Sequence, residues 1–228
     1  PRADVAVIQY TGGTTGIPKG ALLTHESVMA NREQVARWYS DLEKGRETVL
    51  GVLPLFHVFA MTVVMNLAIA VAARMVLLPK FDIDQLLKVI DEKKPSLFPG
   101  VPTLFNAINN HPQFAKFDLS SLTYCISGGA PLPVEVKKKF EENTGCKVVE
   151  GYGLTEAAPV VSCNPLHGVN KAGSIGIPFP HTRVEIRDIE NSERVMPQGE
   201  SGELCVYGPQ VMLGYWKKPD ETAKTLRG

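Results

Sequence analysis

Two hydrophobic patterns alternate along the first 150 residues of the chain. Short runs rich in β-branched residues predict strands at 5–8, 48–53, 75–78, 96–99, 122–127 and 147–150, the first of them buried. Stretches with apolar residues three or four apart predict helices at 25–42, 61–73, 82–92, from 102 onward and at 134–144. Strands separated by helices of this size indicate βαβ units.

Repeated βαβ units predict an α/β fold with mainly parallel sheets and helices on both faces. In such sheets ligands bind beyond the carboxyl ends of the strands, where we expect the loops described below. After residue 178 the pattern changes to strict alternation at 183–188 and 203–207, which predicts antiparallel hairpins. We therefore expect an α/β region at 1–180 and the start of a small antiparallel β subdomain at 181–228, whose last residues close no recognisable element.

Composition narrows the function classes. The 228 residues include 24 basic and 24 acidic side chains, so the net charge of +0 argues against nucleic-acid binding. The four cysteines show no C-x-x-C spacing and the five histidines no paired metal-ligand spacing. The apolar stretch 58–73 is too short to cross a bilayer and is expected to be a buried helix.

The loop at 10–20 (YTGGTTGIPKG) is rich in glycine and threonine and is closed by Lys19. Its backbone N–H groups, its hydroxyls and the lysine ammonium suit a polyphosphate. It differs from the G-x-x-x-x-G-K-[ST] phosphate loop, because Gly20 and not Ser or Thr follows the lysine. A flexible turn without a ligand stays open as the alternative for this loop taken alone.

A second stretch, 151–156 (GYGLTE), follows the strand predicted at 147–150. Tyr152 between two glycines can stack on a base, the Thr155 hydroxyl can reach a phosphate, and Glu156 can ligate magnesium. The alternative is a tight turn with a solvated glutamate.

Two further positions follow predicted strands. Gly128, Gly129 and Ala130 are small residues that would let a flat ring lie against the backbone, although a plain strand-to-helix turn explains them equally well. His57 ends the predicted strand region beside the apolar helix, either as a packed histidine or as a gate between an apolar tunnel and the phosphate site.

These motifs together resemble the acyl-adenylate-forming enzymes, whose ordered core motifs look like 10–20, 54–57, 151–156, 202–204 and 214–215 of this chain. The nearest resemblance is to the bacterial long-chain fatty-acid–CoA ligases. They share Gly13 where many relatives have Ser, Ala158-Pro159 after the second motif, and the run 208–216.

The resemblance implies a two-step ligation with ATP, Mg²⁺, a fatty acid and coenzyme A. The fatty carboxylate attacks the α-phosphate of ATP to give acyl-AMP and pyrophosphate, and the coenzyme A thiol then displaces AMP. An aryl- or medium-chain acyl-CoA ligase, an acyl-AMP ligase and a non-catalytic nucleotide-binding scaffold stay open as alternatives. An amino-acid substrate is disfavoured, because 58–61 (VFAM) offers no carboxylate for an α-amine.

Roles follow by the same resemblance. Lys19, His57, Thr155 and Glu156 would act in catalysis, His57 at the acyl carboxylate, and Thr11 with Glu156 would hold magnesium. The implied nucleotide contacts are Thr11, Thr14, Thr15, Gly16, Lys19, Gly128, Gly129, Ala130, Gly151, Tyr152, Gly153 and Thr155.

The family's ribose-binding aspartate and its C-terminal domain with the catalytic lysine are absent from this sequence. We therefore expect a fragment that does not complete turnover. For the full-length protein we expect a cytoplasmic location, either free or peripheral at the inner membrane face, and no nucleic-acid partner. The sequence does not fix the oligomeric state.

Overall fold

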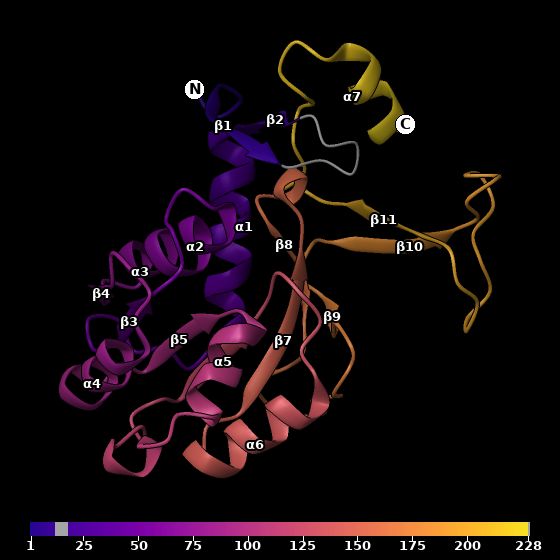
Figure 1. The fold of residues 1–228 in the computed structure, drawn as a ribbon. Helices are drawn as coiled ribbons and strands as arrows, with labels where there is room; N and C mark the ends of the chain where they lie inside the picture. Colours follow the sequence, from indigo (N-terminus) through magenta and orange to yellow (C-terminus); the bar gives the residue numbers. More distant parts are fainter. Residues whose placement is uncertain (12–17, 228) are drawn as a thin grey trace.

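A seven-stranded sheet forms the centre of the molecule in the computed structural model, which describes residues 1–11 and 18–227 (Figure 1). The strands run parallel from β4 to β7, and β8 and β9 join antiparallel at the other edge. In spatial order they are β4 (Arg74–Leu77), β3 (Thr48–Gly51), β5 (Leu97–Gly100), β6 (Tyr124–Ser127), β7 (Val148–Gly153), β8 (Val160–Cys163) and β9 (Ile177–Pro178). The expected mainly parallel sheet is confirmed, whereas β8 and β9 were not predicted.

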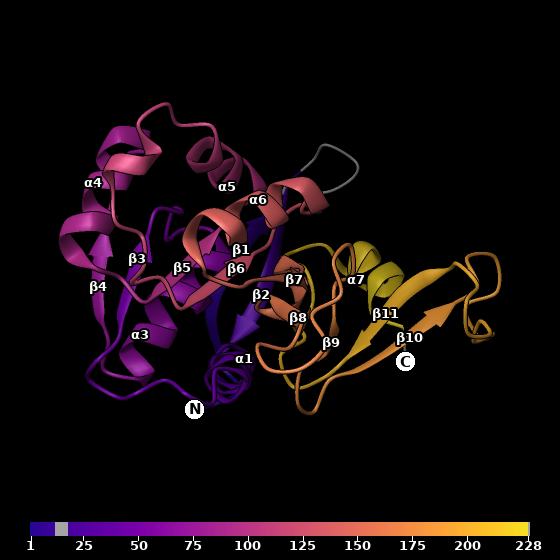
Figure 2. The ribbon, with the colours of Figure 1, turned by 90° about the horizontal axis from the view of Figure 1, so that it is seen from below.

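Helices cover both faces of this sheet, as expected (Figure 2). One face carries α4 (Ile83–Lys93), α5 (Pro102–Asn109) and α6 (Val134–Thr144), which bury an apolar cluster around Phe98, Phe105 and Phe140. The other face carries α1 (His25–Trp38), α2 (Val58–Ala60) and α3 (Leu67–Ala70), packed around Val35, Val64 and Leu67. Two buried layers hold the strands rigid, and the strand ends are thereby fixed in space.

Local signals in the sequence account for the helix ends. Thr24 caps α1 through a capping box with Ser27, in which each side chain bonds the other's backbone N–H at 2.9 Å. Asp82 accepts from the Gln85 N–H at 2.8 Å at the start of α4. Gly145 ends α6 in the left-handed conformation (φ 74°), which glycine adopts without strain.

The first strand differs from its prediction. β1 (Val5–Thr11) pairs antiparallel with β2 (Lys19–Thr24) in a separate two-stranded sheet, and its Val5 and Ile8 side chains are 43% and 40% exposed. A β-branched run predicts a strand but does not reveal whether another layer covers it. Strands β1 and β2 therefore form a hairpin, so the first motif does not follow a parallel strand, which corrects its expected placement.

The helix expected at 61–73 begins earlier and is irregular. It starts at Val58, contains a π-helical stretch over Met61–Asn66 and ends at Ala70. π-helical turns are rare and often lie near functional sites. In this one, the buried Thr62 hydroxyl donates to the Ala158 carbonyl oxygen at 2.9 Å, which ties the helix to the turn after β7.

The last fifth of the chain forms an antiparallel arm and a short helix. The arm pairs β10 (Arg183–Arg187) with β11 (Glu203–Tyr207), as predicted, and it projects from the sheet (Figures 1 and 2). The expectation that the final residues close no element is wrong, because α7 (Pro219–Thr225) forms there with Pro219 at its first turn. Among the described residues, no helix is both long and apolar enough to span a bilayer.

Candidate functional site

The second motif lies at the carboxyl end of β7, where the strand gives way to a 3₁₀ turn over Thr155–Ala157. Gly151 to Gly153 are the last residues of the strand. They do not form the tight turn that the motif alone had left open. A Cβ atom at Gly153 would lie 2.4 Å from the Pro159 carbonyl oxygen, so this position excludes every larger residue. The close approach of the two backbones places Thr155 and Glu156, both half-buried, at the tip of the strand.

Lys19 begins β2, directly after the first loop, and its side chain is only 13% exposed. Its ammonium is 2.6 Å from Glu221 Oε2 on α7 and lies 5.1 Å from the centre of the Tyr215 ring. Hydrogen bonds from Lys19 and then from Lys224 lower the pKa of Glu221 to about 2. The lysine is thus held in one place, and only one of its three N–H groups is needed by the carboxylate.

Tyr215 joins the two motifs. Its hydroxyl donates to Glu156 Oε1 at 2.6 Å, while its ring faces the Lys19 ammonium. Burial and then the hydrogen bond to Glu156 raise the pKa of the Tyr215 phenol to about 12, so the hydroxyl keeps its proton at neutral pH. One buried side chain therefore contacts the lysine of the first motif and the glutamate of the second.

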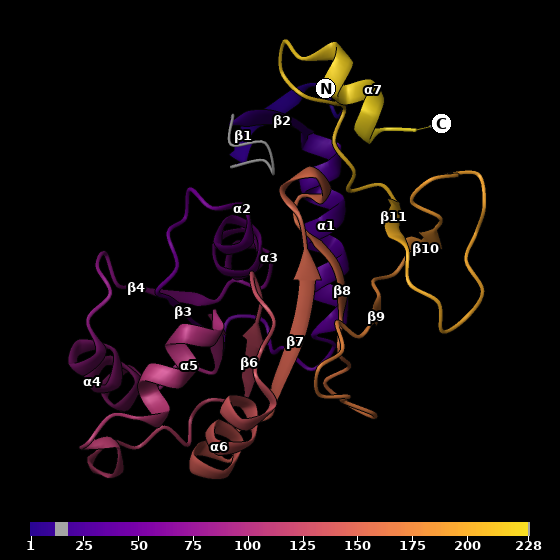
Figure 3. The same ribbon diagram turned by 45° about the vertical axis from the view of Figure 1, so that its right-hand side comes forward.

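Backbone bonds hold the segment 212–222, which we call the clasp, against both motifs. Leu22 donates to the Gly214 carbonyl at 2.8 Å and Trp216 to the Gly20 carbonyl at 2.7 Å, so the clasp extends the β2 edge. Met212 donates to the Glu156 carbonyl at 2.8 Å. Figures 1 and 3 show β2, α7 and the tip of β7 gathered at the same end of the molecule.

The residues expected to border a flat ring follow β6. Gly128 is buried, and an added Cβ would meet the Phe59 ring at 3.0 Å, so Phe59 packs directly on it. Gly129 (φ 79°) and Ala130 are exposed at the start of the loop. Glu150 anchors the far end of that loop, because its carboxylate accepts from the Leu132 N–H at 3.0 Å. These contacts fix the backbone of 128–132 next to Gly151.

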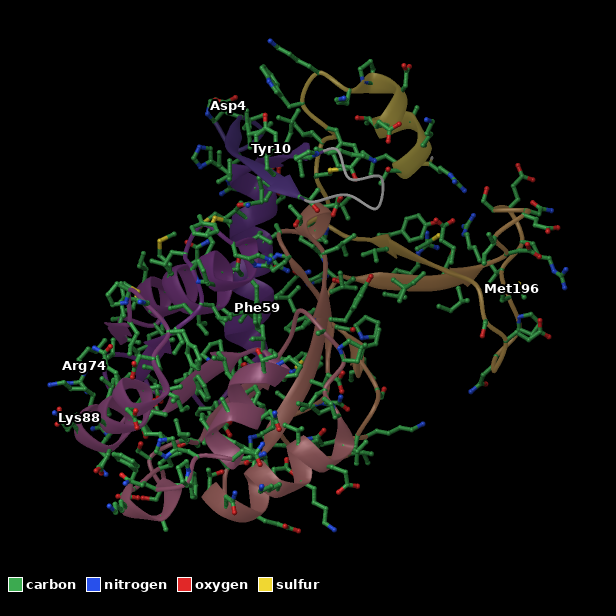
Figure 4. All side chains as sticks on the ribbon, viewed as in Figure 1. Asp4, Tyr10, Phe59, Arg74, Lys88 and Met196 are labelled. Atoms are coloured by element: carbon green, nitrogen blue, oxygen red, sulfur yellow. The ribbon has the colours of Figure 1, made fainter. Side chains whose placement is uncertain are left out.

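His57 is exposed and caps α2, where its Nδ1 accepts from the Phe59 N–H at 3.2 Å. Strand β3 ends at Gly51, so His57 does not terminate the strand as expected. The neutral imidazole carries its proton on Nε2, the nitrogen left open by this bond. Because Phe59 packs on Gly128, the turn that bears His57 lies beside the 128–130 loop, and Figure 4 shows Phe59 in the body of the molecule, below Tyr10.

The donor set for magnesium is small. Within residues 1–11 and 18–227, no group of three or more His, Cys, Asp or Glu side chains could hold a metal ion. Glu156 offers Oε2, to which no described residue donates a hydrogen bond, and Thr11 ends β1 opposite Lys19 in the hairpin. Magnesium is commonly bound by one or two carboxylates plus substrate phosphates, so a single glutamate fits an ion that arrives with ATP.

The structure thus brings Lys19, Thr155 and Glu156 to one end of the molecule, with the 128–130 loop and Gly151–Gly153 at the strand ends below. Thr14, Thr15 and Gly16 lie outside the described residues. Sequence reasoning missed Tyr215 as a link and Glu221 altogether. The available signals were the run 208–216, which includes Tyr215, and an acid at the start of a Pro-initiated helix.

Comparison with known proteins gives the family. Residues 1–216 match the model of the AMP-binding enzymes, so the chain belongs to that family and the resemblance to acyl-adenylate-forming enzymes is confirmed. The chain is 54% identical to the long-chain-fatty-acid–CoA ligase of Bacillus subtilis (strain 168), over all of this chain and 40% of that protein. It is 46% identical to the ligase of the same name from Salmonella typhimurium, over 98% of this chain and 40% of that protein.

The fold is similar to that of a solved structure described as ATP-bound MatB from Rhodopseudomonas palustris. The TM-score is 0.91 at 30% identity, and the match covers all of this chain and 44% of that one. The chain therefore spans about two fifths of the length of these relatives.

Proposed function

We propose that the full-length protein is a long-chain fatty-acid–CoA ligase and that this chain supplies most of its ATP site. The carboxylate oxygen of the fatty acid forms a bond to the α-phosphorus of ATP, and the bond to pyrophosphate breaks. The thiolate of coenzyme A then attacks the acyl carbonyl and AMP leaves, which gives the thioester.

The observation that carries the proposal is the shared contact with Tyr215. Lys19 and Glu156 are 137 positions apart in the sequence, yet both touch one buried tyrosine. A cation and a carboxylate held near each other suit a polyphosphate with its metal ion, because the ammonium offsets phosphate charge and the carboxylate the charge of magnesium. Attack at phosphorus between anions depends mainly on such positioning and charge neutralisation.

Predicted residues that the structure describes then take these roles. Lys19 and the hydroxyl of Thr155 would contact phosphate oxygens. Glu156 Oε2 with Thr11 would hold magnesium, which would neutralise charge on the phosphates. Tyr152 and the 128–130 loop border the adenine. His57 lies on the turn beside that loop, at the N-terminus of the apolar helix that begins at Val58. There it would offer Nε2–H to the acyl carboxylate.

The substrate class rests on two further points. The names of the relatives at 54% and 46% identity favour a long-chain fatty acid. The residues after His57 are Val58, Phe59, Ala60 and Met61, which give no partner for an ammonium group.

The test is fatty-acid-dependent ATP–pyrophosphate exchange by the full-length protein, with Lys19→Ala and Glu156→Gln. We expect each variant to lower the exchange rate by two orders of magnitude or so, as is typical when one electrostatic contact to the transition state is removed. Lys138→Ala and Glu142→Gln are matched controls on the exposed face of α6 and should exchange like the parent.

A panel of acids separates the alternatives. Thioester formed with palmitate supports the proposal, whereas thioester formed only with cinnamate indicates an aryl-CoA ligase. Exchange without thioester, with the acyl group passed to a carrier protein, indicates an acyl-AMP ligase. If no acid supports exchange, the protein is a nucleotide-binding scaffold and the proposal is wrong.

A further inference from the structure

We propose that Glu221 of α7 is a positioning residue for the ATP site, which acts by holding the Lys19 ammonium where it meets the phosphates. The inference rests on the proposed function. It assigns a task to a residue that lies outside the sequence motifs and 202 positions from the lysine it contacts.

The contact itself is short and shielded. Lys19 Nζ and Glu221 Oε2 are 2.6 Å apart, and the two side chains are only 13% and 28% exposed. A free lysine side chain has four rotatable bonds and loses much of its rotamer entropy when a ligand orders it. A lysine already ordered by Glu221 pays less of that entropy when ATP binds, which favours tighter binding.

The local charge still attracts an anion. Glu221 Oε1 also contacts Lys224 Nζ at 3.0 Å, so one carboxylate faces two ammonium groups. The Glu221 charge is therefore shared between Lys19 and Lys224, so it does not fully neutralise either ammonium group. The paired lysine thus stays attractive to phosphate, with two of its N–H groups available.

The clasp keeps this geometry rigid. The Thr222 hydroxyl, next to Glu221 in the chain, accepts from the Tyr215 N–H at 2.8 Å, and its methyl group fills the space beside Gly214. The same clasp pairs with β2 at Gly20 and Leu22, which fixes the backbone that directly follows Lys19. The position of helix α7 therefore determines where Glu221 holds the Lys19 ammonium.

The experiment measures ATP affinity of the full-length protein by equilibrium dialysis, and KM for ATP and for palmitate by exchange. Glu221→Gln should weaken ATP binding about tenfold, a change of about 1.4 kcal/mol, and raise KM for ATP while KM for palmitate stays the same. Asp220→Asn, on the same turn of α7, is the matched control and should change neither. Glu221→Asp should recover part of the affinity.

A double-mutant cycle assigns the effect to Lys19. In the Lys19→Ala background, Glu221→Gln should have no further effect on ATP affinity, because the group that it positions is gone. Tighter ATP binding in Glu221→Gln would show that Glu221 competes with phosphate, and unchanged binding would show a purely structural ion pair. Either result overturns the inference. If Lys19→Ala itself leaves ATP affinity unchanged, the failure belongs instead to the role proposed for Lys19.

Discussion

At the scale of single residues, the site depends on close approaches that only certain side chains permit. Gly153 and the Pro159 carbonyl are the clearest example, since even a methyl group would lie 2.4 Å from that oxygen. Gly128 similarly leaves room for the Phe59 ring. Both glycines were predicted to matter as neighbours of a nucleotide, and the structure adds a packing reason for each.

Gly153→Ala should therefore destabilise the full-length protein by about 1–3 kcal/mol, since the new methyl group forces the β7 and β8 backbones apart. The measurement is denaturant unfolding. Gly145→Ala is a useful comparison, because open space surrounds that glycine and only its φ of 74° opposes the substitution. It should cost about 1–2 kcal/mol, less than Gly153→Ala. Equal costs at the two positions would contradict the steric explanation.

Residue identities could be predicted only in part. Lys19, Thr155 and Glu156 stand out because an ammonium and a hydroxyl suit phosphate and a carboxylate suits magnesium. The structure places all three at one end of the molecule. The charged residues at 137–139 and 141–142 of α6, in contrast, do not all face solvent. Lys137 is in fact buried against the Val148 carbonyl and Glu141, because α6 packs its stem on β7.

At the scale of elements, the accuracy of the predictions follows the strength of the local signal. Helices α4 and α6 were found to within a residue, because an N-cap and a C-terminal glycine mark their ends. β1 was placed in the wrong environment, and β8 and α7 were not predicted. Strand exposure and pairing depend on distant partners. Helix α7 is stabilised by its contacts with Lys19 of β2 and with Tyr215 more than by its own seven residues.

The docking of α7 should depend on pH through Glu221. Its pKa is lowered to about 2 by Lys19 and Lys224, below the usual 4.5, so the folded state favours the carboxylate. The resulting stabilisation is present above pH 4.5 and is lost as the pH falls towards 2. We expect wild-type protein to be more stable than Glu221→Gln at pH 7, with the difference shrinking steadily between pH 4.5 and pH 2.

Unfolding of both proteins by urea across this pH range measures the effect. Asp220→Asn serves as the control. The Asp220 carboxylate is next to Glu221 in the chain, but it makes no ion pair within the described residues. A stability difference between wild type and Glu221→Gln that stays constant from pH 7 to pH 2 would show that the ion pair with Lys19 does not stabilise α7.

At the scale of the whole molecule, a sheet covered on both faces holds the strand ends, and the β1–β2 hairpin with the clasp lies above them (Figures 1 and 3). The layered sheet was predictable, because each βαβ unit is encoded by nearby residues. The position of the clasp was not. It depends on pairing between β2 and residues about 190 positions later, and no local pattern specifies such a contact.

The central claim is that the first loop and the Gly151–Glu156 motif bind a single ATP molecule. A crystal structure of the full-length protein with Mg²⁺ and a non-hydrolysable ATP analogue tests it most directly. We predict phosphate oxygens within hydrogen-bond distance of Lys19 and Thr155, the metal ion on Glu156, and the adenine against Tyr152. A nucleotide that contacts only one of the two motifs, or neither, would contradict the account.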